Sequence, residues 1–177
     1  MQRVFILLTA ILGVVGCAVR GPSAPINDAP DVLKPPPGEA MVWVAAAKGV
    51  QIYECREKKD QPGTVEWALV GPDAVLFDEE GMPIGRHYAG PHWEADDGSK
   101  VLGQVKARAD APIPDAIPWL LLTAKSDGPE GVLSKVTSVQ RIHTTRGMAP
   151  DKGCSQANLS KRMRVPYTAD YYFFGPK

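Results

Sequence analysis

The residues best suited to chemistry are concentrated between positions 81 and 103. This stretch contains two of the three histidines, His87 and His92, together with Trp93, Glu94 and five glycines. Imidazole and carboxylate groups are common acids, bases and metal ligands in proteins. We therefore expect any functional site to include this stretch.

The register of a hairpin decides which of these side chains share a face. A three-residue loop with Gly98 in the left-handed conformation pairs Glu94 with Lys100 and Trp93 with Val101. A two-residue turn would instead mix apolar and charged side chains on both faces, so the longer loop is predicted. One face then carries Trp93, Ala95, Val101, Gly103, Val105 and Ala107. The other carries His92, Glu94, Lys100, Leu102, Gln104, Lys106 and Arg108.

Two interpretations of the polar face are open. In the first, Glu94 orients His92 and His87 arrives from the preceding segment, which forms a polar site. In the second, Glu94 and Lys100 make an exposed ion pair beside a surface histidine, an arrangement that contributes little to stability.

A metal site is a more specific version of the polar-site interpretation. Two histidines with a carboxylate, here His87, His92 and Glu94, can hold zinc or non-haem iron. Their spacing matches no established metal motif, however, and His143 is far away along the chain. The sequence also contains no Gly-x-Ser-x-Gly motif, phosphate loop or dinucleotide fingerprint. We therefore assign no catalytic residue, no metal and no cofactor.

Four further residues are candidates for ligand binding. Tyr88 and Trp93 neighbour the histidines, although Trp93 falls on the predicted core face. Tyr171 belongs to one of two aromatic faces of the last strand, of which one packs in the core and the other can bind a ligand. Arg141 lies among β-branched residues, either on the solvent face of a strand or as a ligand for an anion.

The distribution of prolines and glycines along the chain predicts an all-β fold. The 17 prolines and 17 glycines separate short apolar runs, and no helical apolar stripe exceeds three turns. Strands are expected at residues 41–47, 49–56, 64–70, 74–77, 99–109, 117–124 and 162–174, and within the β-branched run 132–145. At most one or two helical turns are expected in residues 151–162. A single antiparallel β-sandwich or partly closed β-barrel with little helix fits this pattern.

The N-terminus has the pattern of a lipoprotein signal. A short positive region and an apolar run end in Val14-Val15-Gly16-Cys17, which resembles a lipobox with Cys17 as the lipidated residue. An ordinary secretory signal cleaved near Gly16 is the alternative. We expect a signal peptide at residues 1–16, a lipidated cysteine and proline-rich tether at residues 17–40, and one all-β domain at residues 41–177.

The remaining cysteines, Cys55 and Cys154, form an even pair in an exported chain. A disulfide between them is the favoured interpretation, and a reactive thiol is the alternative. Charge is balanced, with 20 Lys and Arg against 20 Asp and Glu, so the chain has no excess positive charge that would attract nucleic acid.

Several stretches resemble an uncharacterised family of secreted bacterial and fungal proteins, domain-of-unknown-function family 3455. They run in order from Gly49 to Phe173 and include residues 49–55, 87–93, 117–121, 140–144 and 165–173. His92 stands where the family often carries threonine, which argues against a shared metal ligand at that position. The resemblance implies export and paired cysteines but brings no established activity.

We expect an outer-membrane lipoprotein that faces the periplasm and binds a small molecule or envelope component without turning it over. Its partners would be the membrane, through the lipid anchor, and that ligand, with no nucleic acid. A metal-assisted hydrolase or oxidoreductase using His87, His92 and Glu94 is one alternative. A purely structural envelope protein is the other.

Overall fold

Eight antiparallel strands form the fold in the computed structural model, which describes residues 29–177. Two short 3-10 turns, η1 (Asp31–Leu33) and η2 (Gln156–Asn158), are the helical elements of this part of the chain. The strands are β1 (Glu39–Lys58), β2 (Gln61–Phe77), β3 (Pro83–Tyr88), β4 (His92–Ala95), β5 (Lys100–Ala109), β6 (Trp119–Ser126), β7 (Ser138–Arg146) and β8 (Arg162–Pro176). The predicted all-β antiparallel class is confirmed.

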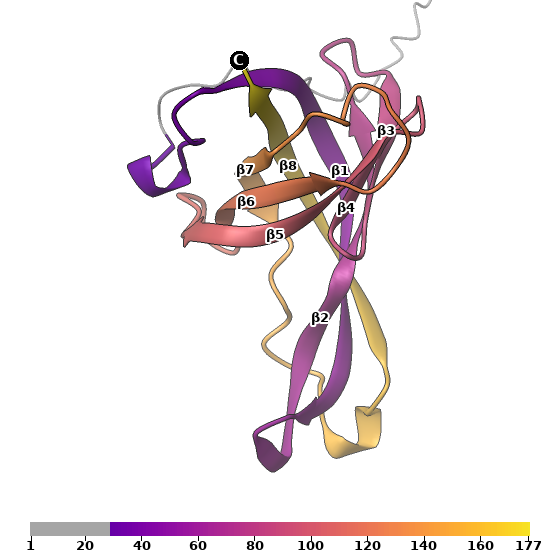
Figure 1. Ribbon diagram of the computed structural model, residues 1–177. Coiled ribbons are helices and arrows are strands. Elements are labelled where there is room, and N and C mark those ends of the chain that lie inside the picture. The colour runs from indigo at the N-terminus through magenta and orange to yellow at the C-terminus, as the bar shows by residue number, and fades with distance from the viewer. Residues whose placement is uncertain (1–28) are drawn as a thin grey trace, which may run out of the picture.

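The sheet is a closed barrel rather than a sandwich (Figure 1). Each strand pairs with the next along the chain, and β8 returns to pair with β1 over residues 39–54. Closure removes the exposed sheet edges that would otherwise invite pairing with other chains. An eight-stranded barrel has an interior that side chains can fill or that can hold one small ligand.

Two of the predicted strand breaks are wrong, because β1 and β2 run through them without interruption. The break expected between residues 47 and 49 lies within β1, where a Cβ on Gly49 would overlap the carbonyl of Asp73 on β2. Gly71 marks a bulge in β2 opposite Ile52, and its φ of +156° suits glycine. Both glycines therefore allow close strand approach and bending rather than turns.

The long strands β1 and β2 continue below the barrel as a hairpin, alongside the start of β8 (Figure 1). The Cys55–Cys154 disulfide is formed, with the two Cα atoms 5.3 Å apart. It joins β1 to the connection between β7 and β8 across a sequence separation of 99 residues. The predicted disulfide is thus confirmed, and it ties this connection to the hairpin.

Buried side chains lie on both faces of the barrel wall. Inside, the largest are Trp93, Tyr167, Tyr171 and Phe173. Outside, a second cluster comprises Leu33, Trp119, Leu121, Ile142, Tyr172 and Phe174. Leu33 of η1 is fully buried in this outer cluster, so the chain already packs on the barrel before β1 begins at Glu39. Cys17 and the predicted signal peptide lie outside the described residues.

The β4–β5 hairpin has the predicted register. Trp93 pairs with Val101 and Glu94 with Lys100, and Gly98 has a φ of +84°. The predicted faces fail only beyond Val105, where a bulge shifts the register of β5 against β6. Arg108 therefore faces the interior and Ala107 packs in the outer cluster, the reverse of the prediction.

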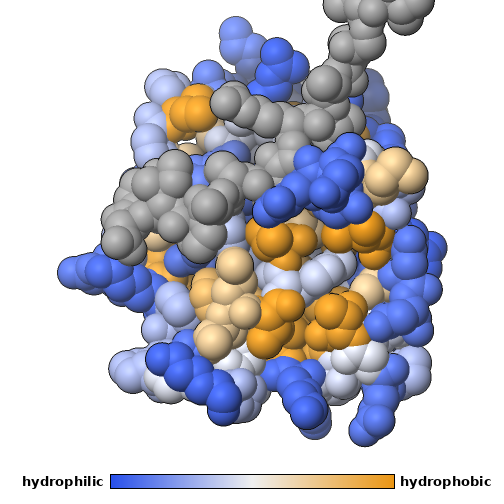
Figure 2. Space-filling view, turned by 90° about the horizontal axis from the view of Figure 1, so that it is seen from above, coloured by the Kyte–Doolittle hydropathy of each residue, from blue (hydrophilic) through white to orange (hydrophobic). Residues whose placement is uncertain are grey.

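The two ends of the barrel differ in character. At the upper end, apolar side chains lie among hydrophilic ones (Figure 2). A shallow hollow here of about 390 Å³ is lined by Met41, Val42, Trp43, Val44, Asp78, Glu79, Glu80 and Ile84. Across residues 29–177, no helix has the length and apolar character needed to cross a membrane.

Candidate functional site

A cavity of about 530 Å³ lies at the lower end of the barrel. The β3–β4 turn, the segment before β6 and the residues after β7 surround it, and the part of the β1–β2 hairpin next to the barrel forms one wall. Most of the lining is apolar: Leu69, Val70, Pro72, Pro91, Val105, Ile117, Pro118, Leu120, Leu122, Met148 and Ala149. Its volume and apolar walls are typical of small-molecule sites.

Three aromatic rings form the inner end of the cavity. His87 stacks on Trp93 with ring centroids 4.4 Å apart and an interplanar angle of 9°. Tyr171 of β8 meets His87 edge-on at 5.0 Å and Trp93 at 5.4 Å. Gly103 makes room for the indole, because a Cβ there would lie 2.6 Å from Trp93 Cζ3. The three rings come from three different strands and pack tightly against one another.

His87 is uncharged in this setting. Its side chain is only 2% exposed, and burial lowers the pKa of the imidazole from 6.5 to about 3. Nδ1 lies 2.7 Å from the carbonyl oxygen of His92, so in the neutral ring Nδ1 is the donor and Nε2 the acceptor. His87 therefore offers the cavity an acceptor and no charge.

The positive charge of the cavity comes from two arginines in one cross-strand row. Arg108 on β5 pairs with Leu120, Leu120 pairs with Arg141 on β7, and Arg141 pairs with Tyr171. Arg141 donates from Nε and Nη2 to the carbonyl of Pro118, at 3.1 and 2.8 Å. Among the described residues that line the cavity there is no carboxylate to neutralise either guanidinium.

Several buried polar groups of the cavity have no hydrogen-bond partner in the described part of the chain. They are Gln51 Nε2, Trp93 Nε1 and the Tyr171 hydroxyl, all on residues that are at most 2% exposed. Burying such a group without a partner costs about 1–3 kcal/mol. Their presence in the lining of one cavity is the kind of exception that calls for an explanation.

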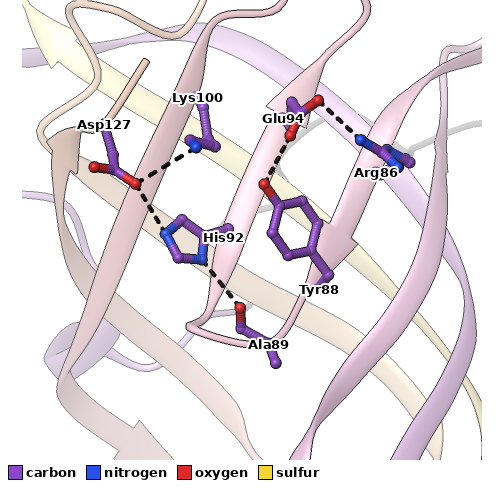
Figure 3. Close-up of polar contacts among 7 residues, drawn as sticks. All are labelled: Arg86, Tyr88, Ala89, His92, Glu94, Lys100 and Asp127. Atoms are coloured by element: carbon purple, nitrogen blue, oxygen red, sulfur yellow. Dashed lines mark hydrogen bonds and ion pairs between the residues drawn. The ribbon is translucent and has the colours of Figure 1, made fainter.

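The outer face of the same strands has a different, internally paired arrangement (Figure 3). Glu94 accepts hydrogen bonds from Tyr88 and Arg86, at 2.7 and 2.9 Å. These partners lower the pKa of Glu94, with Tyr88 the larger cause. Burial and then the Glu94 carboxylate raise the pKa of Tyr88 to about 12. Each charged group in this set faces a partner.

His92 belongs to this outer network as well. Its Nε2 lies 3.0 Å from Asp127 Oδ2, and its Nδ1 lies 3.0 Å from the carbonyl oxygen of Ala89. Lys100 approaches the same Asp127 oxygen at 3.7 Å. The predicted partner of both side chains was Glu94, but their closest acidic contact is Asp127, from the loop after β6.

The predicted site residues therefore divide between the two faces. The structure brings together His87, Trp93, Arg141 and Tyr171 at the cavity, and places Tyr88, His92 and Glu94 on the outer face. Alternate residues of β3 and β4 point to opposite sides of the sheet, which separates His87 from His92. These two histidines and Glu94 do not converge. In residues 29–177 no group of three or more metal-ligating side chains is present.

Sequence reasoning missed three polar residues of the cavity. Arg108 was assigned to the outer face because the bulge after Val105 has no local signal. Gln51 and Tyr53 lie on the inner face of β1, where alternation within residues 49–56 could have identified them as inward-facing. Tyr53 donates to the carbonyl of Gly147 at 2.7 Å and so supports the cavity wall.

Comparison with known proteins gives a family. The family described as protein of unknown function (DUF3455) matches residues 36–175. The chain belongs to this family. The match covers all eight strands apart from the last residue of β8. No curated protein and no solved structure matches the chain.

Proposed function

We propose that this DUF3455 protein is a non-catalytic binding module that holds one small, largely apolar molecule in the lower cavity. The observation that carries the proposal is the combination of an apolar cavity of about 530 Å³ with buried donors left unpaired on its wall. At about 30 Å³ for each water molecule, this volume equals roughly 18 waters. A ligand of that size would bury most of the apolar lining.

The polar groups of the cavity are suited to binding rather than to proton transfer. His87 is the one histidine in the lining, and a base with a pKa of about 3 accepts protons poorly at neutral pH. Burial raises the pKa of Tyr171 and Tyr53, which keeps both phenols protonated. These groups thus have fixed donor and acceptor roles.

The proposal includes attachment to the outer membrane, facing the periplasm, through lipid on Cys17. The lipobox-like Val14-Val15-Gly16-Cys17 supports it, and the Cys55–Cys154 disulfide suits an oxidising compartment. The residues between Cys17 and η1 would link the barrel to the lipid.

A neutral fluorescent probe, N-phenyl-1-naphthylamine, tests the binding function. We expect saturable one-to-one binding with increased fluorescence. Val105→Trp should abolish it, because Val105 lines the cavity and is 55% exposed, so the larger ring can enter the cavity without disturbing the core. Val75→Trp is the matched control, since Val75 is 41% exposed and does not line the cavity. Absence of saturable binding, or equal binding by Val105→Trp, would overturn the proposal.

Membrane attachment has its own test. Cys17→Ser should move the protein from the membrane fraction to the soluble periplasmic fraction, because the acyl chains that anchor it would be lost. Unchanged fractionation would refute lipidation while leaving the binding proposal intact.

A further inference from the structure

The polar groups of the cavity indicate which chemical group the site recognises. We infer that the cavity selects a molecule with a single anionic head, a carboxylate on an apolar body, and that Arg141 binds the head. This inference rests on the proposed function and specifies the ligand of the same site.

The charges that line the cavity are unbalanced. Arg108 and Arg141 both line the cavity, and the described lining residues include no Asp or Glu. Elsewhere on the barrel, Arg86, Arg162 and Arg164 each have a carboxylate within 2.9 Å. The two cavity arginines therefore differ from these arginines in lacking an anionic partner among residues 29–177.

Arg141 also has hydrogen-bonding capacity that its contact with Pro118 does not use. A guanidinium carries five N–H donors, and the Pro118 carbonyl takes one from Nε and one from Nη2. This contact fixes the orientation of the planar group and leaves three donors, which lie close to the Tyr171 hydroxyl. A fixed fork of donors matches the two oxygens of a carboxylate better than a single hydroxyl or amide oxygen.

The remaining unpaired polar groups of the cavity act as hydrogen-bond donors. Trp93 Nε1 and Gln51 Nε2 can only donate, and the Tyr171 hydroxyl has no acceptor in the described part of the chain. Tyr171 neighbours Arg141 directly across the β7–β8 pair. A head with several acceptor lone pairs would satisfy these donors and the guanidinium together.

His87 limits the total charge of the site. It stacks on Trp93 beside Tyr171 but remains neutral, so the two arginines supply the positive charge. Arg108 is exposed at the mouth, whereas Arg141 is partly buried beside the unpaired donors. Arg141 is accordingly placed at the head group, and Arg108 adds attraction at the entrance.

The inference is tested by displacement of N-phenyl-1-naphthylamine from the full-length protein. Decanoate and decanamide differ in the charge of the head and hardly in shape. We expect decanoate to displace the probe at a concentration at least about tenfold lower, since a hydrogen bond between two charged groups is stronger than one to a neutral amide. Arg141→Gln should remove this preference while the neutral probe still binds.

Two further variants make the outcome decisive. Arg108→Gln alters an exposed side chain, so it should fold normally and reduce the preference by less than Arg141→Gln does. Arg56→Gln is the control, because Arg56 is exposed on β1 and does not line the cavity, and it should leave the preference unchanged.

The possible failures are distinguishable. Equal displacement by decanoate and decanamide would overturn the inference and leave the proposed function standing. A preference that survives Arg141→Gln would overturn the role of Arg141. No binding of the neutral probe would overturn the proposed function itself.

Discussion

The two faces of strands β3 and β4 are built from neighbouring residues and behave oppositely. Tyr88, His92 and Glu94 point outward into a network in which each polar group has a partner (Figure 3). His87 and Trp93 point inward, and Trp93 Nε1 has no partner among the described residues. The paired polar groups of the outer face form a solvated network, whereas the unpaired donors inside an apolar cavity support the proposed binding site.

The largest expected difference between the faces is in stability. Trp93→Ala should lower the free energy of unfolding by about 3–5 kcal/mol, because the indole is fully buried and contacts Tyr171 and Phe173. Tyr88→Ala, on the outer side, should cost clearly less. Urea unfolding followed by circular dichroism measures both, and equal losses would mean that the two faces do not differ as described.

The second difference is in the response to pH. His87 has a pKa of about 3 when folded and near 6.5 when unfolded, so the unfolded chain binds the extra proton between these values. Stability from this group is full above about pH 6.5 and is lost as the pH falls, by about 2 kcal/mol at pH 5. His87→Gln should remove this part of the dependence in urea unfolding at pH 7.5 and 5. An unchanged dependence in the variant would contradict the buried, neutral state of His87.

Sequence reasoning located this contrast only in part. The register of the Gly98 hairpin followed from alternation, and it correctly turned Trp93 inward and Glu94 outward. The position of Arg108 could not be predicted, because one extra residue in β5 reverses every later side chain and leaves no mark in composition. The sequence left a sandwich and a partly closed barrel open, since the pairing of β8 with β1 depends on residues more than a hundred positions apart.

The long strands show the same limit. Glycines such as Gly49 and Gly71 are common in turns. In this fold they instead allow neighbouring strands to approach closely and to bend. Which of the two roles a glycine has is decided by the neighbouring strand. Sequence alone could not distinguish them.

The smallest expected effect concerns the outer network. Glu94→Gln should change the free energy of unfolding by less than about 1 kcal/mol, because exposed ion pairs contribute little. The same variant should leave binding of N-phenyl-1-naphthylamine unchanged, since Glu94 does not line the cavity. Loss of probe binding in this variant would show that the outer face takes part in the site.

The filled upper half of the barrel has a consequence for exchange rates. Buried side chains such as Phe173, Val101 and Val139 occupy that half, so the cavity opens at its lower end. A ligand bound there as proposed would enter and leave past the same exposed side chains, which include Leu69 and Met148. A side chain that hinders passage without contacting the seated molecule slows association and dissociation by the same factor. Residence time can thus be tuned at the rim while the equilibrium affinity is set at the inner wall.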